Sequence, residues 1–542
     1  MADLHYASIW EEIADRNGAH EAVVQGSQVL TWADFESRSA RLAGVMQQAG
    51  LGPGSKVATY LFNCPELLET RFAALKQRCV PLNVNYRYRA EEAWYILDNS
   101  DSEAVVFHSS LGAQVQAIQQ RLPRVRLWIE VDDGPGHVTD ALAYEACLAD
   151  AAPAARQERS ADDIQLIYTG GTTGMPKGVM IRIGNAVPAG LGLAASVGLP
   201  ATAPQQIVER AVQLAHEERL PRSLVPCPLI HGTGLQLGAN PFLTLGGCVI
   251  LPASRRFDPA EVWADIDRRA ATHLTLVGEP MARPLLKALL EGEGIRAASL
   301  AWIASSGAMF SQETKRALVD RLPALTIFDL MSSTEGSLAK SFFDRASSPE
   351  TSTFVLNPGA KVFDDNEQEV APGSGRVGRI AVTGAIPLGY YKDPAKTAST
   401  FRVIGGVTWS FPGDHATVDA DGRIHLLGRG SSIINTGGEK VFAEEVEEAI
   451  KRLPGVDDCL VIGLADARLG QQVTALVSPR SAGAQADLGQ ALRDTMASYK
   501  VPRAFVFVDA VPRGPNGKPD HAAARSAAEA ALQQPVNPTE NP

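Results

Sequence analysis

An alternation of apolar runs with helical patterns constrains the fold of this chain more than any other feature of its sequence. Thr31 can cap a helix whose apolar face runs from Phe35 to Ala49, and the glycine- and proline-rich segment 50–54 ends it. Strands that alternate with helices pair in parallel, and the helices form the crossover connections. The pattern continues with strands expected at 56–62, 79–82 and 104–107 and helices at 65–76 and 90–99. The sequence therefore predicts an α/β fold.

The alternation continues to about residue 350 and then gives way to antiparallel signals. The segment 416–427 predicts a β-hairpin that turns on Asp421-Gly422. Beyond 428–432 the pattern indicates a small α+β unit. Residues 110–160 are less informative and are expected to include a surface connection rich in Ala, Asp and Gln. Expected elements are strands at 247–252, 273–277, 459–464, 473–477 and 504–509, and helices at 259–270, 443–453 and 487–498.

These patterns divide the chain into three parts. Residues 1–428 are expected to form a large N-terminal domain of parallel sheets with crossover helices and a β-rich subdomain. Residues 429–525 are expected to form the small α+β C-terminal domain. The stretch 526–542 is rich first in Ala and then in Pro, Asn and Gln, which indicates a flexible tail.

The bulk composition excludes several classes of protein. At 542 residues, with 45% hydrophobic and 20% charged residues, the chain is typical of a globular protein with more than one domain. Its formal charge of −11 argues against a nucleic-acid partner. There is no apolar run long enough to span a bilayer and no export signal at the N-terminus. The six scattered cysteines lack C-x-x-C spacing and indicate thiols in a reducing cytoplasm.

A glycine- and threonine-rich segment follows the apolar strand pattern at 164–168. Glycines let backbone N–H groups approach phosphate oxygens, threonine hydroxyls add donors, and a lysine adds positive charge. The segment lacks the Walker A spacing and the dinucleotide G-x-G-x-x-G, and an ordinary turn is the alternative. We therefore predict a loop that holds a polyphosphate. Its candidate residues are Thr169, Gly170, Gly171, Thr172, Thr173, Gly174 and Lys177.

Two further strands end in small or polar residues, at 302–309 and 327–336. Ligands bind at the carboxyl ends of strands in α/β sheets, so both ends are candidate sites. His231 also ends an apolar run and is followed by Gly-Thr-Gly. By itself such a histidine is more often structural, because no metal-binding partner lies near it in the sequence.

The segment T-G-G-T-T-G-M-P-K-G resembles the signature loop of the adenylate-forming superfamily of acyl-CoA synthetases, luciferases and peptide-synthetase adenylation domains. Further segments resemble that superfamily in the same order across residues 30–520, among them 389–401, which matches almost residue for residue. Within the superfamily, 278–285, 386–391 and 434–442 look most like bacterial acyl-CoA ligases for long-chain and steroid side-chain acids.

The resemblance implies a role for each matching residue. It implies that Glu335 binds Mg²⁺, that Lys518 is the catalytic lysine of a mobile C-terminal domain, and that Ser432 is the hinge. The implied ATP-binding residues, besides the loop and Lys518, are Ser306, Gly307, Ala308, Asp329, Met331, Ser332, Thr334, Asp414 and Arg429. The implied acyl pocket comprises His231, Gly232, Thr233, Gly234, Gln236 and Met331. The implied CoA passage comprises Gly437, Gly438 and Glu439.

Three positions depart from the family pattern. Met331-Ser332 stands where Tyr-Gly is usual, and a thioether stacks on a purine less well than a phenol ring. Pro412 stands where threonine is common, and the hinge position is Ser432 rather than Asp or Lys. The first departure affects the expected shape of the adenine site, while the implied Mg²⁺ role of Glu335 is unaffected.

The expected activity is an ATP-dependent acid:CoA ligase that forms an acyl-AMP and then a CoA thioester. His231, Thr334, Glu335 and Lys518 are the expected catalytic residues. Alternatives are an adenylating enzyme that loads a carrier protein, a luciferase-like oxygenase and a nucleotide sensor, the last disfavoured by Lys518 and Glu335. No Arg or Lys lies in the segments expected to line the acyl pocket, which favours a hydrophobic acid over a dicarboxylate. The sequence leaves a homodimer open.

Overall fold

The computed structural model describes residues 4–171, 174–429, 433–436, 439–466, 469–480, 488–493, 496, 498–514 and 519–533. The chain forms two compact units. The first comprises Met1–Thr351, Asn357–Gly359 and Val382–Ser410, and the second comprises Ser352–Leu356, Ala360–Ala381 and Phe411–Pro542. The predicted boundary at 428–432 therefore falls inside the second unit. A separate domain 429–525 stays a prediction.

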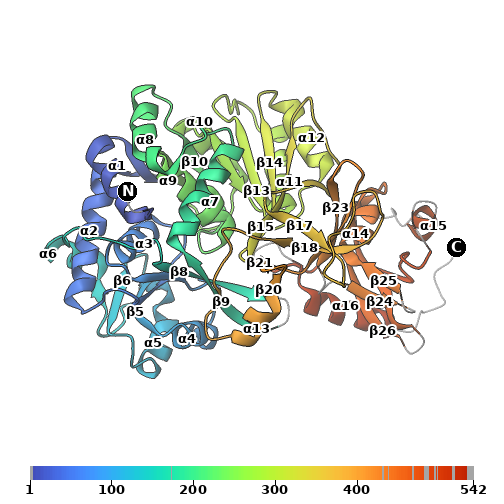
Figure 1. The fold of residues 1–542 in the computed structure, drawn as a ribbon, viewed down its shortest axis with the longest axis horizontal. Helices are drawn as coiled ribbons and strands as arrows, with labels where there is room; N and C mark the ends of the chain where they lie inside the picture. Colours follow the sequence, from blue (N-terminus) through green and yellow to red (C-terminus); the bar gives the residue numbers. More distant parts are fainter. Residues whose placement is uncertain are drawn as a thin grey trace. The chain divides into compact units, whose positions relative to one another are not determined.

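The largest sheet of the first unit contains a run of strands that is parallel in its centre and antiparallel at both of its ends (Figure 1). Its strands occur in the order β2 (Gln28–Thr31), β1 (Glu21–Gln25), β11 (Cys248–Leu251), β10 (Arg222–Leu224), β12 (His273–Leu276), β13 (Trp302–Ser306), β14 (Thr326–Ser333) and β15 (Gly336–Phe343). The antiparallel β15 was not expected, because the sequence indicated antiparallel pairing only from about residue 352.

A second sheet of the first unit is buried on both faces. Successive side chains of a strand point to opposite sides. Val106 accordingly belongs to the same core cluster as residues of helices α2 (Trp32–Gln48) and α3 (Pro65–Lys76). Val105 and Phe107 belong to a second cluster with residues of α4 (Ala90–Asn99) and α5 (Gly112–Ile118). The strands lie in the order β4 (Val80–Asn83), β3 (Lys56–Tyr60), β5 (Ser102–His108), β6 (Leu127–Val131) and β7 (Leu142–Ala143). The predicted parallel pairing is confirmed.

The helices of the first unit also match much of the prediction. Thr31 forms a capping box with Asp34 at the start of α2, as expected. The helices are α1 (Tyr6–Asn17), α2 (Trp32–Gln48), α3 (Pro65–Lys76), α4 (Ala90–Asn99), α5 (Gly112–Ile118), α6 (Tyr144–Asp150), α7 (Ile183–Ser196), α8 (Ile207–His216), α9 (Asn240–Thr244), α10 (Pro259–Arg269), α11 (Gly278–Glu291), α12 (Gln312–Arg321) and α13 (Pro394–Thr400), with the π-helix η4 (Thr233–Ala239). The less informative stretch 110–160 contains α5, β6, β7 and α6, and the expected surface connection corresponds to the largely exposed residues 151–160, which lack regular secondary structure.

The predicted phosphate loop lies largely on a β-hairpin. Strands β8 (Ile164–Gly171) and β9 (Gly174–Arg182) are antiparallel, and β19 (Gly389–Tyr390) pairs with β9. The expectation of a short strand followed by a loop is therefore wrong in its extent. Glycines in strands usually weaken them, and here the third strand adds backbone pairing to β9.

The second unit contains antiparallel strands and a smaller α+β part. The strands are β16 (Thr353–Leu356), β17 (Ala360–Phe363), β18 (Gly378–Val382), β22 (Asp414–Val418), β23 (Arg423–Arg429), β24 (Ile433–Thr436), β25 (Glu439–Phe442), β26 (Val456–Asp466), β27 (Gly470–Pro479) and β28 (Ala504–Phe507), with the helices α14 (Ala443–Lys451), α15 (Leu488–Arg493) and α16 (His521–Gln533). The hairpin β20 (Phe401–Ile404) and β21 (Val407–Ser410) belongs to the first unit. The predicted hairpin that turns on Asp421-Gly422 is confirmed by β22 and β23.

The expectation of a flexible tail from residue 526 is wrong for residues 526–533. These residues form the end of α16, in which Ala524 and Ala528 are buried against Leu460, Leu476 and Val506. Alanine has the highest helix propensity, so an Ala-rich segment with one apolar face forms a helix once a sheet can cover that face. Residues 534–542 lie outside the described part of the chain.

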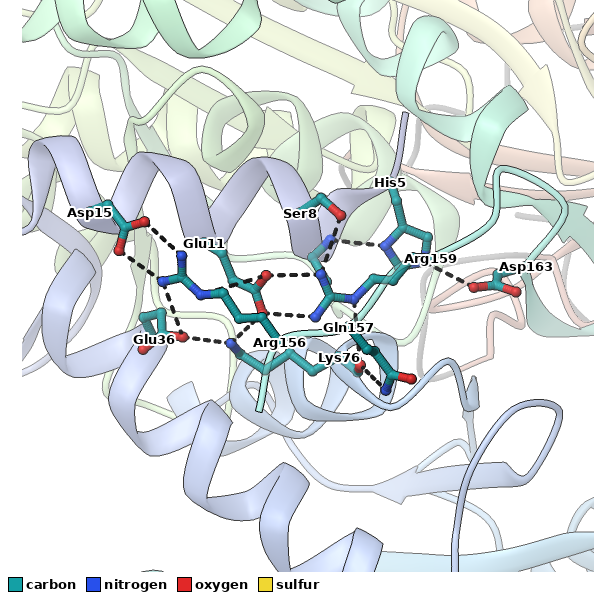
Figure 2. A network of polar contacts seen from close by, with 11 residues as sticks. His5, Ser8, Glu11, Asp15, Glu36, Lys76, Arg156, Gln157, Arg159 and Asp163 are labelled. Carbon is teal, nitrogen blue, oxygen red and sulfur yellow. Dashed lines mark hydrogen bonds and ion pairs between the residues drawn. The ribbon is translucent and has the colours of Figure 1, made fainter. Parts of the chain in front are cut away.

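A buried ionic network joins the first three helices to the segment that leads into β8 (Figure 2). The Glu11 carboxylate of α1 accepts hydrogen bonds from Lys76 of α3 at 2.7 Å and from Arg159 at 2.8 Å through two guanidinium nitrogens. Lys76 also contacts Glu36 of α2 at 2.6 Å. Lys76, Glu11 and Arg159 are nearly inaccessible, with side-chain exposures of 3%, 4% and 2%. Each of these charges has an opposite charge beside it.

Two further expectations concern the cysteines and the membrane. All six cysteine thiols are free, and Cys147 alone of the six is partly exposed. Burial raises the pKa of Cys79, Cys227 and Cys248 to about 12, so these thiols are unreactive at neutral pH. Within the described residues, no helix is long and apolar enough to cross a bilayer.

Candidate active site

The segment that contains His231 packs against the carboxyl end of β13. Thr233, the first residue of η4, donates a hydrogen bond from its hydroxyl to the backbone carbonyl of Ser306 at 3.4 Å. Ser306 is the last residue of β13. Because ligands bind at the carboxyl ends of parallel strands, this contact brings the predicted acyl segment and the predicted adenine segment to one place.

The ends of β13 and β14 meet through two hydroxyls. Ser306 Oγ and Ser332 Oγ lie 2.9 Å apart. Gly307 follows with φ of +90°, a conformation that L side chains rarely adopt, and it is exposed. Glycine at this position therefore leaves backbone that a flat ring can approach, next to the half-buried Ala308.

Thr334 and Glu335 form the turn between β14 and β15, because Ser333 pairs with Gly336. The Glu335 carboxylate is half-buried and accepts a hydrogen bond from the Tyr390 hydroxyl at 2.6 Å. Its backbone carbonyl accepts another from the Ser410 hydroxyl at 2.9 Å. A tight turn with two such contacts holds the carboxylate in a defined position.

Tyr390 also belongs to the sheet of the predicted phosphate loop. Its backbone pairs with Val179 of β9, in the strand that carries Lys177. Lys177 forms an ion pair with Asp393, which caps α13 by accepting a hydrogen bond from the Lys396 backbone at 2.8 Å. The hydrogen bond from Lys177 lowers the pKa of Asp393. One short segment therefore positions both Glu335 and Lys177.

Two asparagines that the sequence reasoning missed attach the His231 segment to its neighbours. Asn83 donates hydrogen bonds to the carbonyls of Ile230 at 2.7 Å and Tyr168 at 3.2 Å, and accepts one from the Tyr168 N–H at 3.0 Å. Asn63 donates to Cys227 at 2.9 Å and accepts from Leu229 at 2.8 Å. Asn83 ends strand β4, so the rule that strand ends carry ligand residues could have found it.

Two further predicted residues of the first unit, Asp329 and Met331, lie on strand β14. Asp329 is buried in an ion pair with Lys315 at 2.6 Å, so its carboxylate already has a protein partner. Met331 lies on β14 and is 8% exposed.

The Gln236 side chain accepts a hydrogen bond from Asn240 at 3.0 Å. A Cβ atom at Gly234 would lie 2.3 Å from the Pro228 carbonyl oxygen, which requires glycine there. The half-buried Gly232 precedes η4.

Asp414 and Arg429 lie in the second unit. They face each other in the ladder between β22 and β23, and Asp414 is buried. Gly428 has φ of +123°, and a Cβ atom there would lie 2.0 Å from a carboxylate oxygen of Glu444. The positive φ disfavours any side chain at this position, which lies beside the first turn of α14.

Several predicted residues lie outside the part of the chain that the structure describes. They are Thr172, Thr173, Ser432, Gly437, Gly438 and Lys518. Thr169 lies on β8 opposite Lys177, and Gly170, Gly171, Gly174 and Glu439 are described only as positions on strands. The roles predicted for all these residues stay predictions.

The described residues contain no cluster of three or more His, Cys, Asp or Glu that could hold a metal ion without other ligands. Mg²⁺ usually keeps several waters and binds through one or two carboxylates together with substrate phosphates. A single half-buried carboxylate that accepts a hydrogen bond from the Tyr390 hydroxyl fits that mode of binding, so Glu335 fits the predicted role.

Comparison with known families identifies the family of this chain. Residues 10–391 match the model of the AMP-binding enzyme, and residues 445–518 match the AMP-binding enzyme C-terminal domain. The chain belongs to the AMP-binding enzyme family. The predicted membership of the adenylate-forming superfamily is thereby confirmed.

Curated relatives match nearly the whole chain. The 3-oxocholest-4-en-26-oate–CoA ligase of Rhodococcus rhodochrous is 39% identical, with 96% of this chain and 95% of the relative covered. A medium/long-chain-fatty-acid–CoA/3-oxocholest-4-en-26-oate–CoA ligase of Mycobacterium marinum is 37% identical, with 97% of each covered. These names confirm the predicted enzyme class, an acyl-CoA synthetase, and the predicted subfamily resemblance.

Solved structures confirm the fold. The ATP-bound crystal structure of MatB from Rhodopseudomonas palustris superposes with a TM-score of 0.80 at 25% identity, covering 96% of this chain and 99% of that one. The anthranilate CoA ligase AuaEII in complex with anthranoyl-AMP gives a TM-score of 0.82 at 20% identity, with 98% and 99% covered. The predicted α/β fold class is confirmed by these neighbours.

Proposed function

We propose that this chain is an ATP-dependent acid:CoA ligase that activates a hydrophobic carboxylic acid as acyl-AMP and transfers the acyl group to CoA. The observation that carries the proposal is a chain of contacts within the first unit. Thr233 contacts Ser306, Ser306 contacts Ser332, and the turn after Ser332 carries Glu335. Tyr390 then connects Glu335 to the sheet of Lys177. Acyl, adenine and phosphate segments far apart in the sequence therefore meet.

In the first half-reaction, the substrate carboxylate attacks the α-phosphate of ATP and pyrophosphate leaves. Lys177 and the hairpin backbone bind the β- and γ-phosphates, and Asp393 gives up its ion pair when they arrive. Glu335 would hold Mg²⁺, which when bound offsets the negative charge of the phosphates. Tyr390 keeps the Glu335 carboxylate in place. Lys518 balances the charge that develops on the α-phosphate.

In the second half-reaction, the thiol of CoA attacks the carbonyl of the acyl-AMP and AMP leaves. The C-terminal part turns about Ser432, withdraws Lys518 and brings Gly437 and Gly438 to the thiol passage. Such a rotation requires only a few residues to change φ and ψ.

The substrate class follows from the lining of the site and from the relatives. Leu229, Ile230 and Leu235 surround His231 with apolar surface. Relatives that match nearly the whole chain are named for medium- and long-chain fatty acids and for a steroid side-chain acid. We therefore propose a hydrophobic acid of one of these classes. The six free thiols fit a reducing cytoplasm, which we propose as the compartment.

The test is pyrophosphate release over a panel of carboxylic acids with ATP and Mg²⁺, with and without CoA. The expected result is acid-dependent release of pyrophosphate, and formation of AMP and acyl-CoA when CoA is present. Acyl-AMP that accumulates and does not react with CoA would favour the alternative, an enzyme that loads a carrier protein. Release of pyrophosphate that does not depend on any acid would contradict the proposal.

A further inference from the structure

A cavity in the first unit lies next to His231 and has one charged group in its wall. Its lining is otherwise mainly apolar, from Leu67 of α3, Pro81 and Leu82 of β4, Leu166 and Ile167 of β8, and the segment around His231. The charged group is Arg71 of α3. The cavity's volume of about 20 Å³ has room for about one water-sized group, such as a single oxygen atom of a larger ligand.

Arg71 is buried, and among the described residues it has no counter-charge. Its residue exposure is 5%, and its Nη2 donates a hydrogen bond to the side-chain oxygen of Gln165 on β8. Within the described residues, no carboxylate forms an ion pair with Arg71, and its Nε has no hydrogen-bond partner. The amide nitrogen of Gln165 also has none. Arg71 Nε and the Gln165 amide nitrogen are therefore donors without a partner among the described residues, and Arg71 itself lines the cavity.

Other buried cations of the same unit differ from Arg71 because they have carboxylate partners. Lys76, five residues along the same helix, contacts Glu11 and Glu36. Arg159 contacts Glu11 through two nitrogens. Burial lowers the pKa of Arg71 to about 10, so the guanidinium is still protonated at neutral pH. An unpaired buried charge is costly, and a ligand that supplies an acceptor removes that cost.

We propose that this cavity receives a second oxygen acceptor of the acid substrate, a carbonyl or a carboxylate, and that Arg71 and Gln165 donate hydrogen bonds to it. The inference rests on the proposed function, because the segment of His231 borders both the cavity and the expected acyl pocket. It names the substrate class as a hydrophobic acid with an oxygen function away from its reacting carboxyl group. Arg71 lies outside the segments whose lack of Arg and Lys argued against a dicarboxylate substrate.

The experiment compares three acids in a series of matched chain lengths: the plain alkanoic acid, the oxo acid and the dicarboxylic acid. Acid-dependent pyrophosphate release gives kcat/KM for each. An acid that bears the acceptor, and is long enough to reach Arg71, should have a kcat/KM about 10-fold or more above that of the plain acid. This is the typical contribution of a hydrogen bond to a charged group. A preference for the oxo acid alone identifies a neutral acceptor, and one for the dicarboxylic acid identifies a charged one.

The variants Arg71→Met and Arg71→Lys separate recognition from folding. Methionine has a similar length and leaves no unpaired charge, so the protein is expected to fold. Arg71→Met should remove the difference between the three acids, and Arg71→Lys should keep part of it. Lys76→Met is the matched control on the same helix, which should lower stability and leave the preference among the acids unchanged.

Two results would overturn the inference: equal kcat/KM for the three acids at every length in the unmodified enzyme, or a preference that Arg71→Met leaves intact. In both cases the ligase activity itself stands. If no acid supports pyrophosphate release, the proposed function fails instead. A rise in Tm caused by the acceptor-bearing acid without ATP, present in the unmodified protein and absent in Arg71→Met, would then still support the cavity, and no rise would overturn it.

Discussion

Two groups of charged side chains in the first unit both form ion pairs, but they differ in their exposure to solvent. In the ionic network of Figure 2, Glu11 meets Lys76 and Arg159, and all three are nearly inaccessible. At the candidate site, the side chains of Lys177 and Asp393 are 38% and 29% exposed. The charges of the first group satisfy one another, whereas those of the second are open to solvent and to a ligand.

The difference teaches how to separate structural charges from functional ones. A carboxylate has about four lone-pair positions, and the two oxygens of Glu11 accept from Lys76 and twice from Arg159. Removing one partner of such a pair leaves a buried charge unpaired, which destabilises the fold. A half-exposed pair such as Lys177 and Asp393 contributes little to stability and can exchange partners. Variants in the two groups should therefore affect different measurements.

The largest effect is expected for Glu11→Gln. The change leaves Lys76 and Arg159 in the interior without their shared carboxylate, and the free energy of unfolding should fall by about 3–5 kcal/mol. Denaturant unfolding measures it. Pyrophosphate release per folded molecule should stay unchanged. A loss under about 1 kcal/mol would mean that the network does not stabilise the fold.

Glu335→Gln should give the reverse pattern. The amide cannot replace a carboxylate that binds Mg²⁺, so pyrophosphate release should fall about 10²- to 10³-fold. The free energy of unfolding should change by no more than about 0.5 kcal/mol, because the side chain is half-buried and lies in a turn. A variant that keeps its rate would remove Glu335 from the site.

Tyr390→Phe should have a smaller effect than either. Phenylalanine keeps the ring and the pairing of β19 with β9, and loses the hydroxyl that donates to Glu335. Removing a hydrogen bond to a charged group should lower the rate of pyrophosphate release roughly 10-fold. The apparent affinity for Mg²⁺ should weaken with it. Equal loss of rate at saturating and limiting Mg²⁺ would show that Tyr390 acts on something other than Glu335.

The smallest expected effect is a pH dependence. Burial alone would raise the pKa of Glu11, but the hydrogen bonds and charges of Arg159 and Lys76 lower it below its usual value. A lowered pKa contributes stability that is present above the unfolded pKa and is lost as the pH falls through the folded one. The unfolding free energy of the unmodified protein should therefore fall more steeply on acidification than that of Glu11→Gln. Parallel slopes would contradict the assignment.

Much of the fold was predictable because it depends on local signals. Helices α3 and α4 have the predicted bounds, since Pro65 begins the first and acidic residues occupy the first turn of the second. Helix α16 was missed because a short alanine-rich helix is only marginally stable by itself, and here the sheet that covers its apolar face stabilises it. The hairpin of β8 and β9 was missed because glycine and threonine there are also typical of a loop.

The candidate site was predictable in its residues more than in its contacts. Glu335 and Tyr390 are separated by 55 residues, and Asn83 and Ile230 by 147, so tertiary structure alone brings them together. Arg71 was missed for a similar reason, because a helix that packs beside β8 places its side chain at the cavity. Motifs identify the groups that bind a nucleotide, while the residues that position them come from distant segments.

The central claim is that one chain adenylates an acid and then transfers the acyl group to CoA. Measuring both half-reactions of Lys518→Ala on one preparation tests this claim most directly. Adenylation from acid and ATP should fall by orders of magnitude, because a charge directed at the transition state is lost. Thioester formation from prepared acyl-AMP and CoA should stay near the unmodified rate. Equal losses in the two half-reactions would contradict a lysine that acts in the first step and withdraws before the second.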